Sequence, residues 1–360
     1  MNEQLEIWSD FYRYKKFSVY DKLMNYFRLA GQQKPVCFVD YSQTVPLPKR
    51  ALIYEDVKQF WQSDIAPTTK TFTETMDSII IGIIEKVSSS NKKLAVWYSG
   101  GTDSTAILSA VLKNSSKDFQ KEKLLVRLTK DSIEEYPWFY ENYIHDKLNH
   151  KISSLNEYFD DGYYNIDGVF GDTVFGEHYI PELIEKGYLK SNVDWLAQPV
   201  ERFEEILDSV LKNIELSNWL YSSMEPMFKK YKAQNVFDAF WLQGAAMNLN
   251  QLHWMPFTLN YDVANISPEI IRQKFQDHYE TRVFSHPDMF SFAFSHRRSS
   301  ESDIYRARVC SNKYSLDFSN DMDYFNNKKK VSSQIKMYHS TPYSSMLTDF
   351  SVQKDIIYRI

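Results

Sequence analysis

The sequence predicts an α/β protein built on a parallel β-sheet, with a small irregular α+β region before the sheet and a mainly helical part after it. Residues 94–98 and 124–128 are apolar runs of strand length, and a segment with helical spacing lies between them. This alternation of strand, helix and strand is typical of parallel sheets with right-handed crossovers. Strand patterns fade from about residue 195 onward. We therefore divide the chain into residues 1–70, 71–195 and 196–360.

The composition excludes several classes of protein. Of the 360 residues, 43% are apolar and 25% are charged, which fits neither a disordered chain nor a fibrous one. The net charge of -5 argues against a broad basic surface for nucleic acid. The longest aliphatic run, at residues 79–84, is far shorter than a membrane span. Because the 2 cysteines can form neither a disulfide framework nor a zinc site, and no secretory leader is recognisable, we expect a soluble, reduced, cytoplasmic protein.

The first elements of the chain are predicted from breakers and spacing. Short strands are expected at 35–39 and 51–54, with Pro46 and Pro48 between them, and a polar linker at 62–70. A helix should follow, because Thr71 and Glu74 have the spacing of a capping box and six later apolar residues form one helical stripe. That stripe consists of Met76, Ile79, Ile80, Ile83, Ile84 and Val87.

The following elements surround a glycine turn. The strand at 94–98 ends at this turn, and residues 106–111 continue as a helix. The second strand, at 124–128, precedes a helix predicted at 133–148 in spite of Pro137. Two more helices are predicted at 200–214 and 236–252.

The turn from Ser99 to Ser104 carries the clearest chemical signal. Gly100 and Gly101 allow a tight turn without a Cβ in the way, so several backbone N–H groups and a helix N-terminus face one cavity. This arrangement suits phosphate, and the hydroxyls of Ser99 and Ser104 can add hydrogen bonds. Asp103 would repel a bare phosphate, so it indicates a divalent cation between the two groups. The spacing matches neither the dinucleotide fingerprint nor the Walker lysine loop.

This Ser-Gly-Gly-x-Asp-Ser turn after a strand resembles the pyrophosphate-binding loop (PP-loop) of the N-type ATP pyrophosphatases. Residues 167–176 resemble the Ser-Gly-x-Gly-x-Asp-Glu-x-Phe-Gly-Gly segment of the asparagine synthetase and β-lactam synthetase family. The resemblance covers about residues 71–335 and implies a Rossmann-like sheet of the adenine nucleotide alpha hydrolase type. It also implies that Asp103 and Asp172 hold Mg²⁺ on the phosphates of ATP, where the metal would stabilise the departing pyrophosphate.

The resemblance also assigns the residues around the nucleotide. The glycine turn would cradle the β- and γ-phosphates. Backbone groups of Tyr98, Asp167 and Gly168 would hold the nucleoside, and those of Arg127 and Leu128, at the end of the second strand, would lie around the adenine. Because these contacts use the backbone, the side chains at these positions need no special chemistry.

Two fainter segments extend the resemblance. Residues 280–288 resemble the Glu-x-Arg-x-Pro-Phe-x-Asp stretch of the same family, with the proline displaced. Lys313 and Lys330 resemble the two family lysines that bind the phosphates and stabilise charge in the transition state. The spacing is about three residues shorter than in the family, so Lys328 and Lys329 are alternatives to Lys330. A solvated basic run is an equally good explanation of these three lysines.

Several departures from the family pattern bear on the product. The acidic residue that asparagine synthetases place near the amine is Val169 here, a glycine is Phe170, and the glutamate after the metal-binding aspartate is Thr173. The product is therefore left open. Position 2 is Asn2 instead of the nucleophilic cysteine of class II glutaminases, and about 95 residues before the turn are too few for that domain. We expect no release of ammonia from glutamine by this chain.

The remaining polar residues carry little information. Glu134 and Glu135, like Glu204 and Glu205, are expected on solvated helix faces. None of the 8 histidines has a partner at the spacing of metal ligands, and Cys310 has no feature of a nucleophile.

The predicted function is that of an ATP-dependent, amide-forming ligase. A substrate carboxylate would be adenylated with release of pyrophosphate, and an amine or ammonia would then take the acyl group. The expected cofactors are ATP and Mg²⁺, and the expected partners are a small carboxylate and an amine, with no membrane and no nucleic acid. A homo-oligomer is left open. Two alternatives stay open: a PP-loop enzyme that adenylates a nucleobase carbonyl in tRNA or nucleotide modification, and an ATP-binding protein without catalysis.

Overall fold

The computed structural model describes residues 67–153, 157, 160–169, 171, 174, 199–211, 214–236, 238–242, 280–296 and 306–328. The described residues belong to two compact units. One unit contains those between 80 and 168, together with 280–283 and 311–328. The other contains those between 67 and 79, between 169 and 242, and between 284 and 310. The strands predicted at 35–39 and 51–54 lie outside the described residues.

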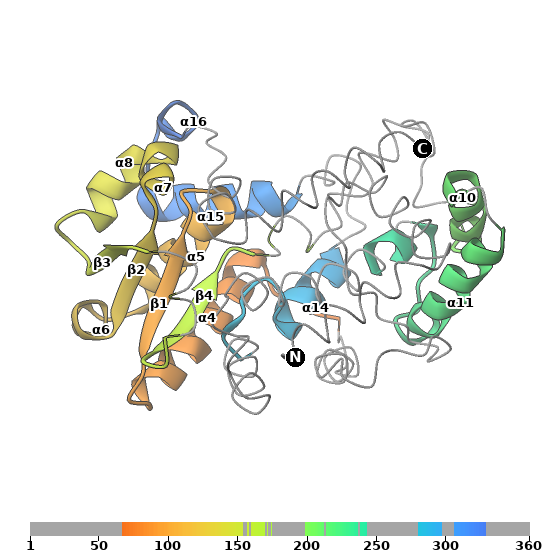
Figure 1. The fold of residues 1–360 in the computed structure, drawn as a ribbon, viewed down its shortest axis with the longest axis horizontal. Helices are drawn as coiled ribbons and strands as arrows, with labels where there is room; N and C mark the ends of the chain where they lie inside the picture. The colour runs from red at the N-terminus through yellow and green to blue at the C-terminus, as the bar shows by residue number, and fades with distance from the viewer. Residues whose placement is uncertain are drawn as a thin grey trace, which may run out of the picture. The chain divides into compact units, whose positions relative to one another are not determined.

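The described part of the first unit is built on a parallel sheet of four strands in the order β3-β2-β1-β4. The strands are β1 (Lys93–Tyr98), β2 (Leu124–Leu128), β3 (His150–Ile152) and β4 (Tyr163–Asp167), and Figure 1 shows them side by side. Both predicted strands are therefore confirmed, as is the predicted α/β class with a parallel sheet.

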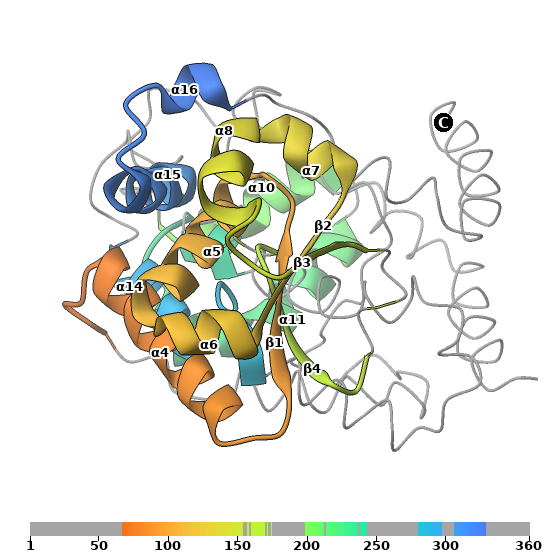
Figure 2. The same cartoon turned by 90° about the vertical axis from the view of Figure 1, so that its left-hand side faces the viewer.

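The burial of β1 explains its continuous apolar pattern. Residues 94–98 are all buried, which requires an unbroken apolar run instead of an alternating one. Helices α5 (Thr102–Asn114) and α6 (Lys117–Glu122) cover one face of the sheet, as Figure 2 shows. Their apolar sides supply part of the core that β1 faces.

Helix α4 (Phe72–Ser88) begins with the predicted capping box. The Thr71 backbone N–H donates to Glu74 Oε2 at 2.8 Å, and the Glu74 backbone N–H donates to Thr71 Oγ1 at 3.2 Å. Two backbone donors at the helix start are thereby satisfied reciprocally. The prediction of a capped helix at this position is confirmed.

The segment predicted to be helical at 133–148 is helical only in part, and it is broken at Tyr136. The segment forms α7 (Lys130–Glu135), α8 (Pro137–Phe139) and a π-helical turn, η1 (Tyr140–Ile144). Tyr136 separates α7 from α8 with φ -140° and ψ 71°. The ring of Pro137 disfavours the α conformation of the residue before it, so the helix must end there. The Thr129 side chain caps α7 by accepting from the Ser132 backbone N–H at 3.2 Å.

The order of the strands reverses between β1 and β4. The chain leaves β1 for β2 on one side, and later returns to place β4 on the other side of β1. The pairs Tyr98–Leu128 and Trp97–Asp167 align the carboxyl ends of the three strands. In open α/β sheets, ligands bind outside the carboxyl ends of strands at such a reversal point. A ligand site is therefore expected at this edge of the sheet.

The described part of the second unit is mainly helical. It contains α10 (Arg202–Leu211), α11 (Ile214–Lys230) and α14 (Pro287–His296), and residues 236 and 238–242 are also helical. The helix predicted at 200–214 corresponds to α10. Helix α15 (Arg306–Ser319) has residues assigned to both units, and α16 (Tyr324–Asn327) belongs to the first unit. None of the described helices has both the length and the apolar character that crossing a membrane requires.

Candidate functional site

The glycine turn after β1 is held in shape by its own serine hydroxyls. Ser104 Oγ accepts from the Ser99 backbone N–H at 3.1 Å and donates to the Gly101 carbonyl at 3.1 Å. The Ser99 hydroxyl lies 2.9 Å from Ser104 Oγ and accepts from the Gly101 backbone N–H at 3.1 Å. Either hydroxyl can donate in the contact between the two serines. The hydroxyls expected to meet phosphate therefore also build the turn.

The turn leads into the N-terminus of α5. The first intrahelical bond runs from the Thr105 backbone N–H to the Gly101 carbonyl at 3.0 Å. The N–H groups of Thr102, Asp103 and Ser104 precede this bond, so the helix supplies no acceptor for them. Together with the helix dipole they favour an anion at the carboxyl end of β1. Asp103 lies in this first turn, where its charge is itself favourable to the dipole.

Gly168, directly after β4, packs onto the same helix terminus. A Cβ on Gly168 would lie 2.7 Å from the Ser104 backbone nitrogen and 3.1 Å from the carbonyl carbon and the Cβ of Asp103. Only a glycine fits between these atoms without a shift. The start of α5 after the glycine turn and the chain after β4 thus pack closely against each other, at the point where the strand order reverses.

Gly100 is constrained by α7 and by its own backbone. Its φ is +76°, in the left-handed region, and a Cβ there would lie 2.4 Å from the Ser132 carbonyl oxygen and 2.8 Å from Glu135 Cβ. Any side chain at this position would therefore be strained and would also displace α7. Gly101 is less restricted, because the nearest atom to its added Cβ is Ser99 Oγ at 3.0 Å.

Glu135 lies beside the turn and corrects an expectation from the sequence. Glu134 is exposed as predicted, but Glu135 is buried, and its Oε1 lies 3.6 Å from the position that a Gly101 Cβ would occupy. The Lys328 ammonium donates to Glu135 Oε1 at 3.1 Å. Of the lysine run at 328–330, Lys328 is thereby placed near the turn. Lys329 and Lys330 lie outside the described residues.

The other predicted lysine, Lys313, lies on an exposed face of α15. Its ammonium donates to Asp317 Oδ2 at 2.7 Å, one turn along the same helix. With side chains 73% and 59% exposed, this pair contributes little to stability. A role for Lys313 at the phosphates stays a prediction.

Two tyrosines line the base of the turn. Tyr98 is buried and stacks on Phe139 at 5.7 Å between ring centroids, and its burial raises the pKa of its hydroxyl. Tyr324, on α16, is also buried. Its burial raises its pKa to about 12, an effect that the charges of Asp103 and Glu135 strengthen and a hydrogen bond with Thr102 opposes. Both phenols are therefore neutral at ordinary pH and act as packing and hydrogen-bonding groups.

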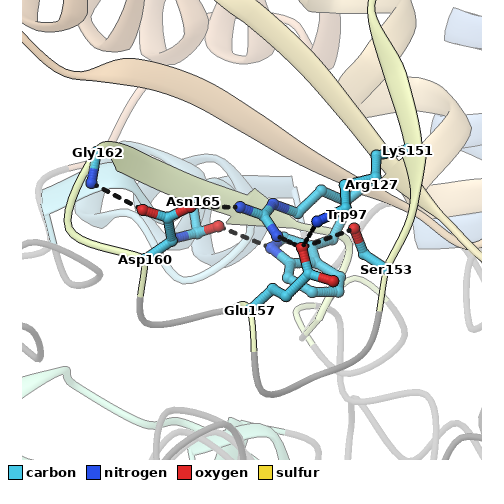
Figure 3. Close-up of polar contacts among 8 residues, drawn as sticks. All are labelled: Trp97, Arg127, Lys151, Ser153, Glu157, Asp160, Gly162 and Asn165. Carbon is cyan, nitrogen blue, oxygen red and sulfur yellow. Dashed lines mark hydrogen bonds and ion pairs between the residues drawn. The ribbon is translucent and has the colours of Figure 1, made fainter.

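Arg127 is the largest departure from what the sequence indicated. Its side chain was expected to be unspecialised, yet it is 1% exposed and pairs with Glu157 Oε2 at 2.7 Å and Asp160 Oδ2 at 3.2 Å. Figure 3 shows both carboxylates turned toward the guanidinium. The guanidinium also lies 5.5 Å from the ring of Trp97 and 5.0 Å from that of Tyr163. This cluster fastens the connection between β3 and β4 to the sheet.

The backbone of Leu128 is also engaged at the end of β2. Its carbonyl accepts from the Ser153 backbone N–H at 3.0 Å, which continues the pairing with the chain after β3. A contact of Arg127 or Leu128 with adenine stays a prediction. Asn165 on β4 accepts from Trp97 Nε1 at 2.8 Å through its side chain and from Thr281 Oγ1 at 2.9 Å through its carbonyl. Thr281, near the start of the segment 280–288, is thereby tied to β4.

Of the predicted metal pair, only Asp103 lies among the described residues. Asp172 lies outside the described residues, as do Phe170 and Thr173, whereas Val169 is half-buried directly after Gly168. Among the described residues, no group of three or more His, Cys, Asp and Glu side chains could hold a metal ion. The assignment of Asp103 and Asp172 to Mg²⁺ stays a prediction.

Comparisons of the chain with protein-family models, with curated proteins and with solved structures gave no match. The features of this chain that bear on its function are therefore the turn, its glycine contacts and the buried ion pair beside it.

Proposed function

We propose that this chain is an ATP-dependent ligase of the PP-loop type, which forms an amide through an acyl-adenylate. The observation that carries the proposal is the contact of Gly168 with the start of α5, with 2.7 Å from its added Cβ to the Ser104 nitrogen. Two glycine-containing segments from different strands meet at the reversal point of a parallel sheet, the usual ligand position in such folds. The Rossmann-like character expected from the resemblance belongs to this proposal.

The groups around the turn fit a nucleoside triphosphate. The N–H groups at the start of α5 and the helix dipole suit the β- and γ-phosphates. Asp103 would hold Mg²⁺ together with Asp172, and the metal would supply positive charge for the leaving pyrophosphate. The proposal gives Lys328 the phosphate-binding role that the resemblance gave to Lys330.

The reaction consists of two displacements. A carboxylate oxygen of the substrate forms a bond to the α-phosphorus of ATP while the bond to the β-phosphate oxygen breaks, and pyrophosphate leaves with the electron pair. An amine nitrogen then attacks the acyl carbon, AMP leaves with the electron pair, and the nitrogen loses one proton to solvent. The protein's part is to orient the reacting groups and to stabilise the charge on the phosphates. Small-molecule partners and a cytoplasmic location belong to the same proposal.

Exchange of labelled pyrophosphate into ATP tests the proposal. The protein would be given Mg²⁺, ATP and pooled carboxylic acids, with Asp103→Ala as the site variant and Asp118→Ala, an exposed aspartate of α6, as the matched control. We expect exchange that depends on one acid pool, is lost in Asp103→Ala and is kept in Asp118→Ala. Full exchange in Asp103→Ala would contradict the metal assignment. ATP binding with no exchange in any pool would favour a nucleobase substrate or a protein that only binds the nucleotide.

A further inference from the structure

Helix α7 brings a carboxylate to the side of the glycine turn. Its contact with the turn is so close that an added Gly100 Cβ would lie 2.8 Å from Glu135 Cβ. The Glu135 carboxylate lies beside the turn, because its Oε1 is 3.6 Å from the position that a Gly101 Cβ would occupy. An unpaired carboxylate in this place would oppose any phosphate, because like charges repel strongly where water is excluded.

Lys328 compensates this charge and is held at both ends. Its backbone N–H donates to the Tyr324 carbonyl at 2.9 Å, which fixes its position after α16. Its ammonium donates to Glu135 Oε1 at 3.1 Å. The two side chains are only 16% and 10% exposed, so the long lysine stem has far less freedom than on an open surface.

We propose that Glu135 is a positioning residue, which holds the Lys328 ammonium beside the glycine turn so that the lysine meets the polyphosphate of the ligand. The proposal rests on the proposed function and adds a residue to it. A buried ion pair alone stabilises a fold weakly, whereas a lysine held in place by a carboxylate can bind phosphate without first losing its conformational freedom. Protein kinases orient a phosphate-binding lysine with a glutamate in the same way.

A double-mutant cycle on polyphosphate binding tests this inference. Titration calorimetry would measure the affinities for pyrophosphate with Mg²⁺, for ATP with Mg²⁺ and for AMP. The proteins are wild type, Glu135→Ala, Lys328→Ala and the double variant, with Glu134→Ala as the control from the exposed face of α7. Glu135→Gln keeps an acceptor for the ammonium and serves as the conservative variant.

We expect Glu135→Ala and Lys328→Ala each to weaken pyrophosphate and ATP binding by about tenfold, and the double variant to be no weaker than Lys328→Ala alone. Binding of AMP, which lacks the outer phosphates, should change by less than about twofold in all variants. Glu135→Gln should keep most of the affinity, and Glu134→Ala all of it. If Glu135→Ala does not fold, Glu135→Asp, which withdraws the carboxylate by one methylene, provides the same cycle.

Three results would overturn the inference. Tighter pyrophosphate binding in Glu135→Ala would show that the carboxylate only opposes the ligand. If Glu135→Ala weakened pyrophosphate binding equally in the wild-type and Lys328→Ala backgrounds, Glu135 would act through the fold. The same would follow if Glu135→Ala weakened AMP binding as much as pyrophosphate binding. A wild-type protein that binds neither pyrophosphate nor ATP would refute the proposed function itself, and that outcome is distinct from a binding-competent protein with an additive cycle.

Discussion

The substitution Gly168→Ala probes the contact on which the proposed site depends. The added methyl carbon would lie 2.7 Å from the Ser104 backbone nitrogen, whereas ordinary contact begins at 3.4 Å, so the atoms must separate by about 0.7 Å. The obstructing atoms include the backbone of α5, which cannot rotate away as a side chain would. Either the chain after β4 or the first turn of α5 has to move.

Such overpacking destabilises proteins by about 1–3 kcal/mol. We expect Gly168→Ala to lower the free energy of unfolding by that amount, measured by urea denaturation, and to weaken ATP binding because the helix terminus is displaced. The matched control is Gly82→Ala in α4, where an added Cβ meets nothing within 4 Å. That substitution should stabilise the protein by about 0.5–1 kcal/mol, since alanine loses less backbone entropy in a helix than glycine does.

A Gly168→Ala protein as stable as wild type would refute the contact between Gly168 and α5. A protein that is destabilised but binds ATP with unchanged affinity would keep the contact and refute its place in the nucleotide site. The two outcomes can be told apart, because the free energy of unfolding and the affinity for ATP are measured on the same sample by different methods.

Three further predictions concern stability. Arg127→Met should lower the free energy of unfolding by about 1–3 kcal/mol in urea, less than a fully buried pair would lose because its two carboxylate partners are 28% and 46% exposed. The control Lys151→Met, at an exposed neighbour, should lower the free energy of unfolding by less than about 0.5 kcal/mol. A larger loss in Lys151→Met than in Arg127→Met would contradict the central place of Arg127 in the cluster. Tyr324, whose pKa is raised from 10.0 to about 12, contributes stability that is complete below pH 10 and is lost as the pH rises toward 12. Tyr324→Phe should therefore flatten the decline of the melting temperature in that range, and an unchanged slope would contradict its burial. Thr71→Ala should cost about 1 kcal/mol by calorimetry through loss of the α4 cap, with Thr71→Ser close to wild type.

The sequence predicted those elements whose causes are local. The strands at 94–98 and 124–128 are continuous apolar runs, and the capping box of α4 needs only residues three positions apart. The strands β3 and β4 were not predicted, because they are short and partly polar. Their stability comes from neighbours in the sheet, as the bond between Asn165 and Trp97 illustrates. Pro137 ends α7 at Tyr136, because its ring disfavours the α conformation of the residue before it.

In the candidate site, too, features with local causes could be predicted and features that depend on distant residues could not. The glycine turn could be predicted because its backbone requirement is contained in six consecutive residues. Glu135 could not, because it lies on a short polar helix, and its burial depends on Gly100 and on Lys328, 193 residues later in the chain. The position of Arg127 was identified, but its role was missed for the same reason. Its partners, Glu157 and Asp160, follow a further strand, and nothing near Arg127 in the sequence indicates them.

Packing alone accounts for more of the glycine motif than the resemblance suggests. Gly100 is required by the closeness of α7, and Gly168 by the closeness of α5, whether or not a phosphate binds. Asp103 is favourable in the first turn of a helix for reasons of its dipole alone. The pair of Glu135 and Lys328 is different, because an apolar pair could fill the same space at least as well and a buried ion pair adds little stability. A phosphate ligand would explain the presence of this ion pair, which packing alone does not explain. Measuring polyphosphate binding in the Lys328→Ala protein therefore separates a nucleotide site from a structural turn before any carboxylate substrate is known.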